Sequence, residues 1–280
     1  MNSSLSLATL ALGVFVTYAS LAASQSTDPL ESQREALANA TLDKGFGPQS
    51  PRNIDAIFGT NPQHFNYAPP APKMNLCNIH FHKNAEHKGG EFTRFAGVGN
   101  GHGYHSGYLY TGTLSAQESA SYDQPVCGSE YQRVQVGDTL ELHYVYSTAS
   151  VAPGPTLGAC LSDATVNPQL RVEAQVLVVV NDQQANNFSQ LTKVGQRNGR
   201  YQAIHLPDNS GQPVTYLGST TGPGYNQKGS PYQVTWRVRP HVQKVDIASV
   251  QRWCQANVFN ERHAHGVRNL VTNPALLSAQ

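Results

Sequence analysis

The sequence has few charged residues of either sign. Lys and Arg together number 19, Asp and Glu number 18, and charged residues make up 13% of the 280 positions. This is roughly half the usual share of about a quarter. The net charge of +1 argues against a strongly basic nucleic-acid-binding protein and against an acidic disordered tail. A small neutral molecule or a metal ion is therefore a better expectation than a polyanion.

Long apolar runs are also scarce. The longest mostly apolar stretch runs from Leu7 to Ala23, and it ends among small residues. Its position and length predict a signal peptide over residues 1–23, which is cleaved on export. No later segment has the 18 or so apolar residues that a membrane-spanning helix needs. We therefore expect a mature chain of residues 24–280 that is periplasmic or secreted and does not bind the membrane.

The chain has only four cysteines, and no two have the C-x-x-C spacing of a cysteine zinc site. They are Cys77, Cys127, Cys160 and Cys254. An even number of cysteines in an exported chain predicts disulfides, for which three pairings are possible. A bridge from Cys77 would support the histidine-rich segment that follows it, but its partner stays open.

Glycine, proline and tyrosine are abundant, with 24, 17 and 13 copies. Glycine-rich stretches separate segments with alternating or continuous apolar residues, which are typical of strands. The strands are expected at Asn75–His82, Thr139–Tyr146, Arg171–Val180 and Tyr232–Val238, and helices at 27–43 and Asp246–Cys254. With no linker and no repeat, the sequence predicts a single, mainly β domain with a few short helices.

Eleven histidines are present, and two of them form an H-x-H pair, His80 and His82. Because side chains alternate along a strand, both imidazoles lie on one face. A third ligand is available from His143, which shares a strand face with Glu141. A carboxylate beside a ligating histidine accepts its distal N–H and fixes its tautomer. Three neutral histidines and one open position describe a catalytic zinc site.

Two other interpretations are compatible with the same residues. A cupin-like exported metalloenzyme would use His80, His82, Glu86 and a later histidine around a six-coordinate metal such as Mn or Fe. A non-catalytic metal-binding protein would use the H-x-H pair for metal capture alone. The spacing of the histidines does not select among these possibilities.

Several short motifs occur in the order found in carbonic anhydrases. They are Gln49-Ser50-Pro51-Arg52-Asn53-Ile54, His80-Phe81-His82, Glu86-His87, Glu141-Leu142-His143, Gly218-Ser219-Thr220-Thr221-Gly222-Pro223, Val234-Thr235-Trp236 and Asn260–Asn269. These motifs resemble those of the alpha class. Glu86-His87 follows the H-x-H pair closely, and His143 lies 61 positions after His82. Both spacings are similar to those of the delta class. The chain therefore resembles a delta-class carbonic anhydrase with alpha-class-like motifs.

This resemblance implies a central, twisted, mostly antiparallel sheet and reversible hydration of CO₂ to bicarbonate and a proton by zinc-bound hydroxide. His80, His82 and His143 would bind Zn²⁺, with Glu141 behind them. The remaining implied residues are Thr220 or Thr221 with Glu86 (or Glu91 in its place) as the hydrogen-bonding relay, and Val145, Val176 and Trp236 as the CO₂ pocket.

Turnover also requires that a proton leave the site. A mobile histidine with a pKa near 7 suits this task. Three histidines are candidates for the proton shuttle: His64, and His102 and His105 in the glycine-rich stretch from Gly97 to Gly107.

Overall fold

The computed structural model describes residues 66–97, 99–100, 102–165, 168–221 and 229–267. The predicted signal peptide, the expected helix at 27–43 and the motif at 49–54 lie outside the described residues. The extent of the domain over 24–280 also stays a prediction. Within the described residues, no helix is long and apolar enough to cross a membrane.

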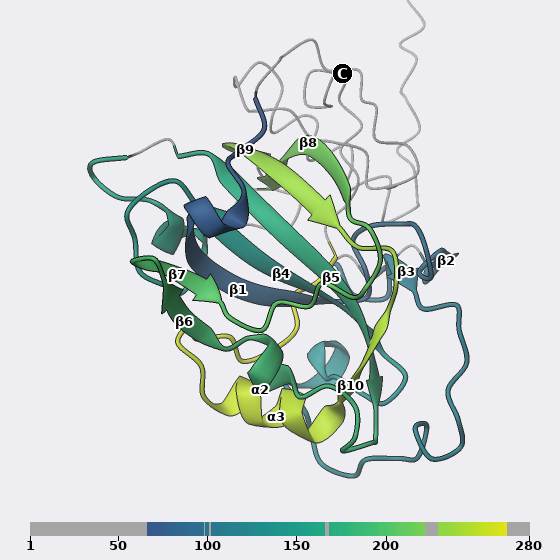
Figure 1. The fold of residues 1–280 in the computed structure, drawn as a ribbon. Helices are drawn as coiled ribbons and strands as arrows, with labels where there is room; N and C mark the ends of the chain where they lie inside the picture. Colours follow the sequence, from purple (N-terminus) through teal and green to yellow (C-terminus); the bar gives the residue numbers. More distant parts are fainter. Residues whose placement is uncertain (1–65, 98, 101, 166–167, 222–228, 268–280) are drawn as a thin grey trace, which may run out of the picture.

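A sheet of six strands forms the centre of the protein (Figure 1). Its strands are β1 (Asn75–Lys83), β4 (Thr139–Ser147), β5 (Leu170–Val180), β8 (Val214–Thr221), β9 (Gly229–Val238) and β10 (Gln243–Asp246). They follow the order β1-β4-β5-β9-β8, and β10 pairs with β5. The β1–β4, β4–β5 and β8–β9 pairs are antiparallel, whereas β9 and β10 run parallel to β5. The mostly antiparallel, mainly β fold predicted from the sequence is confirmed.

Smaller elements surround this sheet. Two short hairpins are formed by β2 (Arg94–Phe95) with β3 (Tyr108–Leu109), and by β6 (Val194–Arg197) with β7 (Arg200–Ala203). Helices are α2 (Phe188–Leu191) and α3 (Ile247–Gln255), with 3₁₀ turns η1 (Ala71–Lys73), η2 (Glu130–Gln132) and η3 (Leu157–Cys160). Helix α3 begins after Asp246, whose carboxylate accepts from the Ser249 N–H at 3.0 Å and so caps the helix.

The two faces of the sheet have different coverings. On β4, the alternate residues Leu140, Leu142 and Tyr144 pack into the larger apolar core, which includes residues of α2 and α3. There the rings of Phe81, Phe188 and Trp253 lie 5.1–5.8 Å apart between centroids, and each such pair adds about 0.5–1.5 kcal/mol beyond its buried area. The opposite face of β4 carries Glu141, His143 and Val145. This second face contains the histidine site.

The four strands expected from apolar patterning are present, each extended by one to three residues, and the helix expected at Asp246–Cys254 is α3. Strand β8 is not among the strands expected from the sequence, because Gly218 interrupts its apolar pattern. In the structure Gly218 lies within β8 and pairs with Val234 of β9. A glycine costs a strand some stability but is tolerated where neighbouring strands supply the hydrogen bonds.

Two disulfides join Cys77 to Cys160 and Cys127 to Cys254, so no described cysteine is free. The first bridge joins Cys77 of β1, three residues before His80, to Cys160 of η3. The second ties the loop around Cys127 to the last turn of α3. The expected disulfides are present, and the bridge from Cys77 supports the strand that carries the H-x-H pair.

Candidate metal centre

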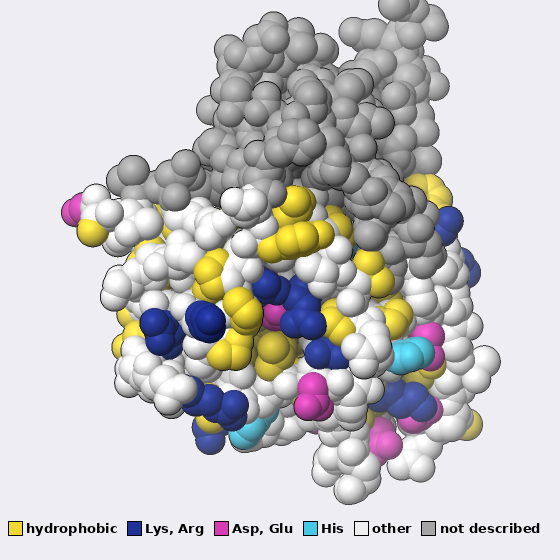
Figure 2. Space-filling model, turned by 45° about the horizontal axis from the view of Figure 1, so that its top comes forward, with side chains coloured by type: hydrophobic (Ala, Val, Ile, Leu, Met, Phe, Trp, Pro, Cys, Tyr) yellow, Lys and Arg dark blue, Asp and Glu magenta, His cyan; other side chains and the backbone are white. Residues whose placement is uncertain are grey.

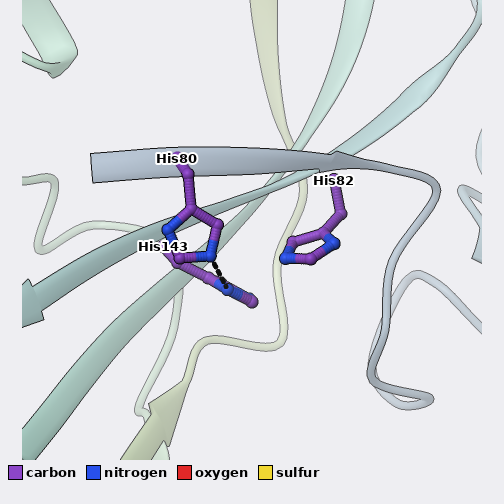
Figure 3. A group of neighbouring side chains, drawn as sticks. All are labelled: His80, His82 and His143. Carbon is purple, nitrogen blue, oxygen red and sulfur yellow. Dashed lines mark hydrogen bonds between the residues drawn. The ribbon is translucent and has the colours of Figure 1, made fainter. Parts of the chain in front are cut away.

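Strand register brings the three predicted ligands together. His80 and His82 lie two residues apart on β1 and therefore project from the same face. In the antiparallel pairing of β1 with β4, His80 lies opposite His143, and His82 lies opposite Glu141. Directly opposite residues on one face have neighbouring side chains. Figure 3 shows the three imidazoles converging below β1, and one nitrogen of each lies within 4.8 Å of the others.

Each of these imidazoles has its outward nitrogen bound to a fixed acceptor. His80 Nδ1 lies 2.7 Å from Asn78 Oδ1, His82 Nδ1 lies 3.0 Å from the carbonyl oxygen of Gly266, and His143 Nε2 lies 2.9 Å from Glu141 Oε1. These acceptors take N–H donors only, so they set the tautomer of each neutral ring. The nitrogens left with a lone pair are Nε2 of His80, Nε2 of His82 and Nδ1 of His143.

The spacing of the nitrogens that carry a lone pair suits zinc. His80 Nε2 and His143 Nδ1 lie 3.3 Å apart (Figure 3). In this tautomeric state each of these two ring nitrogens presents a lone pair, so no N–H joins them directly. A tetrahedral Zn²⁺ with Zn–N distances of about 2.0–2.1 Å holds its ligand nitrogens about 3.3–3.4 Å apart. The donor set, three neutral imidazoles, also fits this metal.

Burial keeps His82 neutral. Desolvation, together with the nearby imidazoles of His143 and His265, lowers the pKa of His82 to about 3, although the Glu86 carboxylate acts in the opposite direction. A histidine with this pKa has its lone pair available throughout the physiological pH range.

Glu141 is the centre of the polar network behind the ligands. Its Oε2 accepts from the backbone N–H groups of Glu86 at 2.6 Å and His87 at 3.0 Å, and its Oε1 accepts from His87 Nδ1 at 2.5 Å and His143 Nε2 at 2.9 Å. Burial alone would raise the pKa of this carboxyl group, but the electrostatic attraction and the hydrogen bonds of the His87 and His143 rings hold the pKa well below the usual value. Glu141 is therefore a buried, ionised acceptor.

His87, Glu141 and His143 also lie close enough together to suggest a second metal group. Their contacts are those of a hydrogen-bonded chain instead. His87 Nδ1 donates to Glu141, and its Nε2 accepts from the Tyr216 hydroxyl of β8. The Glu141 oxygens already have four N–H donors. We therefore assign this group to the support of His143, and the sequence motif Glu86-His87 contributes its histidine to that support.

The three predicted pocket residues lie on the same face of the sheet as the histidines. Val145 follows His143 by two positions on β4, and Val176 pairs with Glu141 across β4 and β5. The ring of Trp236 on β9 lies 5.0 Å from that of His143, at an angle of 73° between planes. All three side chains are buried in one apolar cluster. Their apolar surroundings are compatible with CO₂, and their role stays a prediction.

The predicted relay residues are only partly described. Thr220 and Thr221 are the last residues of β8, and their side chains lie outside the described part of the chain. Glu86 is buried, and its Oε1 lies 3.5 Å from His82 Nδ1. Glu91, the alternative, is directed elsewhere, because its Oε2 accepts from the backbone N–H of Val242 at 2.7 Å. This contact favours Glu86 over Glu91.

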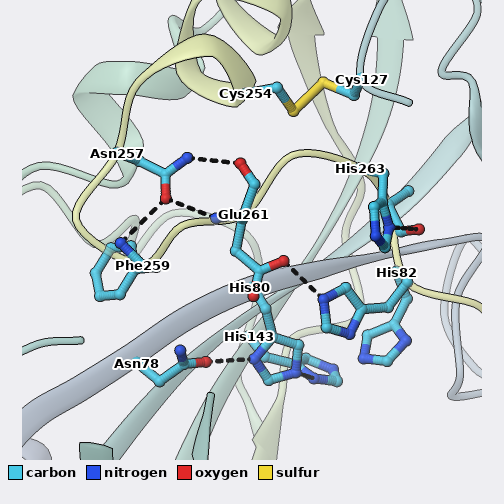
Figure 4. A network of polar contacts seen from close by, with 12 residues as sticks. Asn78, His80, His82, Cys127, His143, Cys254, Asn257, Phe259, Glu261 and His263 are labelled. Atoms are coloured by element: carbon cyan, nitrogen blue, oxygen red, sulfur yellow. Dashed lines mark hydrogen bonds and ion pairs between the residues drawn. A yellow bond between two sulfur atoms is a disulfide. The ribbon is translucent and has the colours of Figure 1, made fainter. Parts of the chain in front are cut away.

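The three candidate shuttle histidines are not brought together. His64 lies outside the described residues. His102 is exposed and stacks on Tyr131 with 6.0 Å between ring centroids, and His105 is exposed at a left-handed turn with a φ of 64°. Sequence analysis did not identify His265, which lies much nearer. Its ring stacks on His80 at 5.2 Å, and its Nε2 lies 2.7 Å from Glu261 Oε2. Figure 4 shows Glu261 close to the three histidines of the candidate site.

Asn78 and Gly266 were also missed. Asn78 follows the same strand alternation as His80 and His82, so its place on their face could have been inferred from period 2. The contribution of Gly266 is a backbone carbonyl 184 positions from His82, and no side-chain pattern reports such a contact. The segment around Gly266 lies against β1, where the His265 N–H donates to the Phe81 carbonyl and the Lys83 N–H donates to the His265 carbonyl.

Gly266→Ala is expected to weaken metal binding without removing a ligand. An added Cβ would lie 2.6 Å from the His102 carbonyl oxygen and 2.9 Å from the Gly103 backbone, so the segment would have to move. That movement would disturb the acceptor of His82 Nδ1 and lower zinc affinity by about tenfold or more. Competition with a zinc chelator measures this change. Gly158→Ala, whose added Cβ would meet only the Thr156 hydroxyl at 3.3 Å, is the control and should retain zinc affinity. Unchanged affinity in Gly266→Ala would contradict this role of the carbonyl.

Comparison with known proteins identifies the class. A family model described as delta carbonic anhydrase matches residues 71–249, which is more than half of the chain. The protein is a carbonic anhydrase. It belongs to the delta carbonic anhydrase family. An alpha-carbonic anhydrase from Photobacterium profundum is similar at 16% identity and a TM-score of 0.30, over 88% of this chain and 96% of that chain. No curated protein matches the chain.

Proposed function

We propose that the protein is a zinc-dependent carbonic anhydrase that interconverts CO₂ and bicarbonate at the site formed by His80, His82 and His143. The observation that carries the proposal is the arrangement of the three rings: each outward nitrogen has an acceptor, and each remaining nitrogen faces the same point. When bound, zinc acts as a Lewis acid that lowers the pKa of a coordinated water to about 7.

The residues around the triad have distinct parts in this proposal. Glu141 holds His143 in the tautomer with a free Nδ1 and increases the basicity of the ring. Val145, Val176 and Trp236 supply an apolar wall for CO₂. Either Thr220 or Thr221, with Glu86, would orient the attacking oxygen by hydrogen bonding, which is a positional contribution to the rate. His64, His102 and His105 are retained as candidates for proton export.

The position of Glu86 weighs against the cupin-like alternative. A cupin-type site would require its carboxylate among the metal ligands. In this structure the Glu86 carboxylate lies beside His82 Nδ1, the nitrogen turned away from the other two histidines. The ligand set is therefore one of three imidazoles. A protein that only captures metal would have the same triad, so activity must separate that alternative from an enzyme.

A pH-indicator assay of CO₂ hydration tests the proposal. Zinc-loaded protein should accelerate hydration, a chelator that removes zinc should abolish the acceleration, and added Zn²⁺ should restore it. Inactivity of the zinc-loaded protein would overturn the proposed function. Full activity after complete zinc removal would overturn the proposed role of the metal. The chain's disulfides are compatible with export to an oxidising compartment, which we propose is the periplasm or the exterior.

A further inference from the structure

A basic cluster lies on the face of the sheet opposite the histidines. Arg171 and Glu173 project from β5 on that face, and Arg237 projects from β9. Arg239 lies two residues after Arg237, and its backbone N–H donates to the Ala174 carbonyl of β5. Because side chains alternate along a strand, Arg239 projects from the same face as Arg237. Figure 2 shows Lys and Arg side chains gathered around an acidic side chain near the middle of one face of the molecule. In a chain with so few charges, this concentration stands out.

One carboxylate, that of Glu173, contacts two arginines of the cluster directly. Glu173 is buried, with Arg171 Nη1 at 3.4 Å and Arg237 Nη1 at 3.1 Å from its Oε1. The three guanidinium groups are near this carboxylate and that of Asp208, which also acts on Arg239, so the cluster keeps an excess of one positive charge. Arg171 uses its other edge within the protein, because Nε donates to the Pro69 carbonyl and Nη2 to the Ala68 carbonyl. Arg171 and Glu173 therefore form the base of the cluster.

Arg237 and Arg239 are different, because each contacts the protein through Nη1 alone. Arg237 Nη1 bonds to both oxygens of Glu173, and Arg239 Nη1 bonds to the carbonyl oxygens of Asp208 at 3.0 Å and Gly211 at 2.6 Å. Within the described part of the chain, no acceptor contacts Nε or Nη2 of either residue. That edge of a guanidinium group is the one that binds two oxygens of an anion side by side.

We propose that Arg237 and Arg239 form a binding site for an oxyanion, such as a phosphate, sulfate or carboxylate group. The geometry supports it in two ways. The Nη1 contacts fix both side chains before a ligand arrives, which reduces the entropy lost on binding. The Arg237 side chain is also 31% exposed, so part of it is accessible to a ligand from solvent. Burial, and then the positive charge of Arg237, lower the pKa of Arg239, whereas the carboxylates of Glu173 and Asp208 act in the opposite direction. A bound anion would reduce the remaining repulsion between the two arginines.

The site is separate from the proposed metal centre. It lies on the other face of the sheet, and its residues take no part in holding or supporting the histidines. Its ligand class includes bicarbonate, the anion of the reaction proposed above, together with phosphate and sulfate. The inference concerns binding at this face, so it does not depend on whether the protein hydrates CO₂.

Arginine Nε–H signals in a ¹⁵N NMR titration test the proposal with the zinc-loaded full chain. Inorganic phosphate, sulfate, bicarbonate and chloride are added separately at constant ionic strength. We expect saturable shifts in the Nε–H signals of Arg237 and Arg239, assigned from the single Arg→Gln variants, with at least one oxyanion and not with chloride. The oxyanion that binds most tightly identifies the ligand class.

The paired variants separate a specific site from general attraction. Arg237→Gln/Arg239→Gln should weaken oxyanion binding at least tenfold in calorimetric titration and leave CO₂ hydration unchanged. Arg94→Gln/Arg252→Gln removes the same charge from two exposed arginines elsewhere and should retain the affinity. Absence of saturable binding, equal loss in both double variants, or the same shifts with chloride would each overturn the proposal.

Discussion

Replacement of His143 by alanine is expected to reduce CO₂ hydration to the uncatalysed background. The other two proposed ligands lie on β1, and His143 is the proposed ligand that β4 contributes. Without its Nδ1, two imidazoles remain, which is fewer than the three protein ligands of catalytic zinc sites. The change also leaves the Glu141 carboxylate without one of its two imidazole donors, so the support of the site is lost together with the ligand.

Two measurements on the purified variant check this expectation. Zinc content after dialysis should fall well below one equivalent, and the hydration rate should match that of buffer. His205→Ala provides the matched control, since it removes an exposed imidazole that contacts only the Gln190 carbonyl among its described partners. That control should retain both zinc and activity. A His143→Ala protein with the wild-type hydration rate would refute the assignment of the ligand.

The second large effect is expected for Glu141→Gln. The glutamine side chain has the same size. However, both Glu141 oxygens accept hydrogen bonds from N–H groups, and an NH₂ group in place of one oxygen cannot accept them. Loss of such a partner of a ligating histidine typically lowers metal affinity or activity 10–100-fold. Each buried donor left without an acceptor also costs about 1–3 kcal/mol. We therefore expect weaker zinc binding together with a lower free energy of unfolding.

Denaturant unfolding of the metal-free protein and chelator competition of the zinc-loaded protein measure the two effects independently. Glu130→Gln removes an exposed carboxylate and should change neither quantity. If Glu141→Gln bound zinc with wild-type affinity, the carboxylate would have no part in setting the His143 tautomer, and the proposed support of the site would have to be abandoned.

The sequence indicates the proposed metal ligands because their signals are local. Alternation alone places His80 with His82, and Glu141 with His143, whatever the rest of the chain does. Which of these residues oppose one another depends on the register of β1 with β4, which alternation within a single strand does not determine. Gly266, Tyr216 and His265 reach the site through contacts between distant segments. A backbone carbonyl or a lone tyrosine carries no motif, so such contacts become visible only in three dimensions.

The two disulfides have a consequence for how the protein must be produced. In chain order the cysteines are 77, 127, 160 and 254, and the bridges join the first to the third and the second to the fourth. The two covalent loops therefore overlap along the sequence. If each cysteine paired with the next cysteine of the chain as it left a translocation channel, the disulfides formed would be non-native. A host that secretes the chain and also reshuffles mispaired thiols should therefore yield more native protein than a host that only oxidises them.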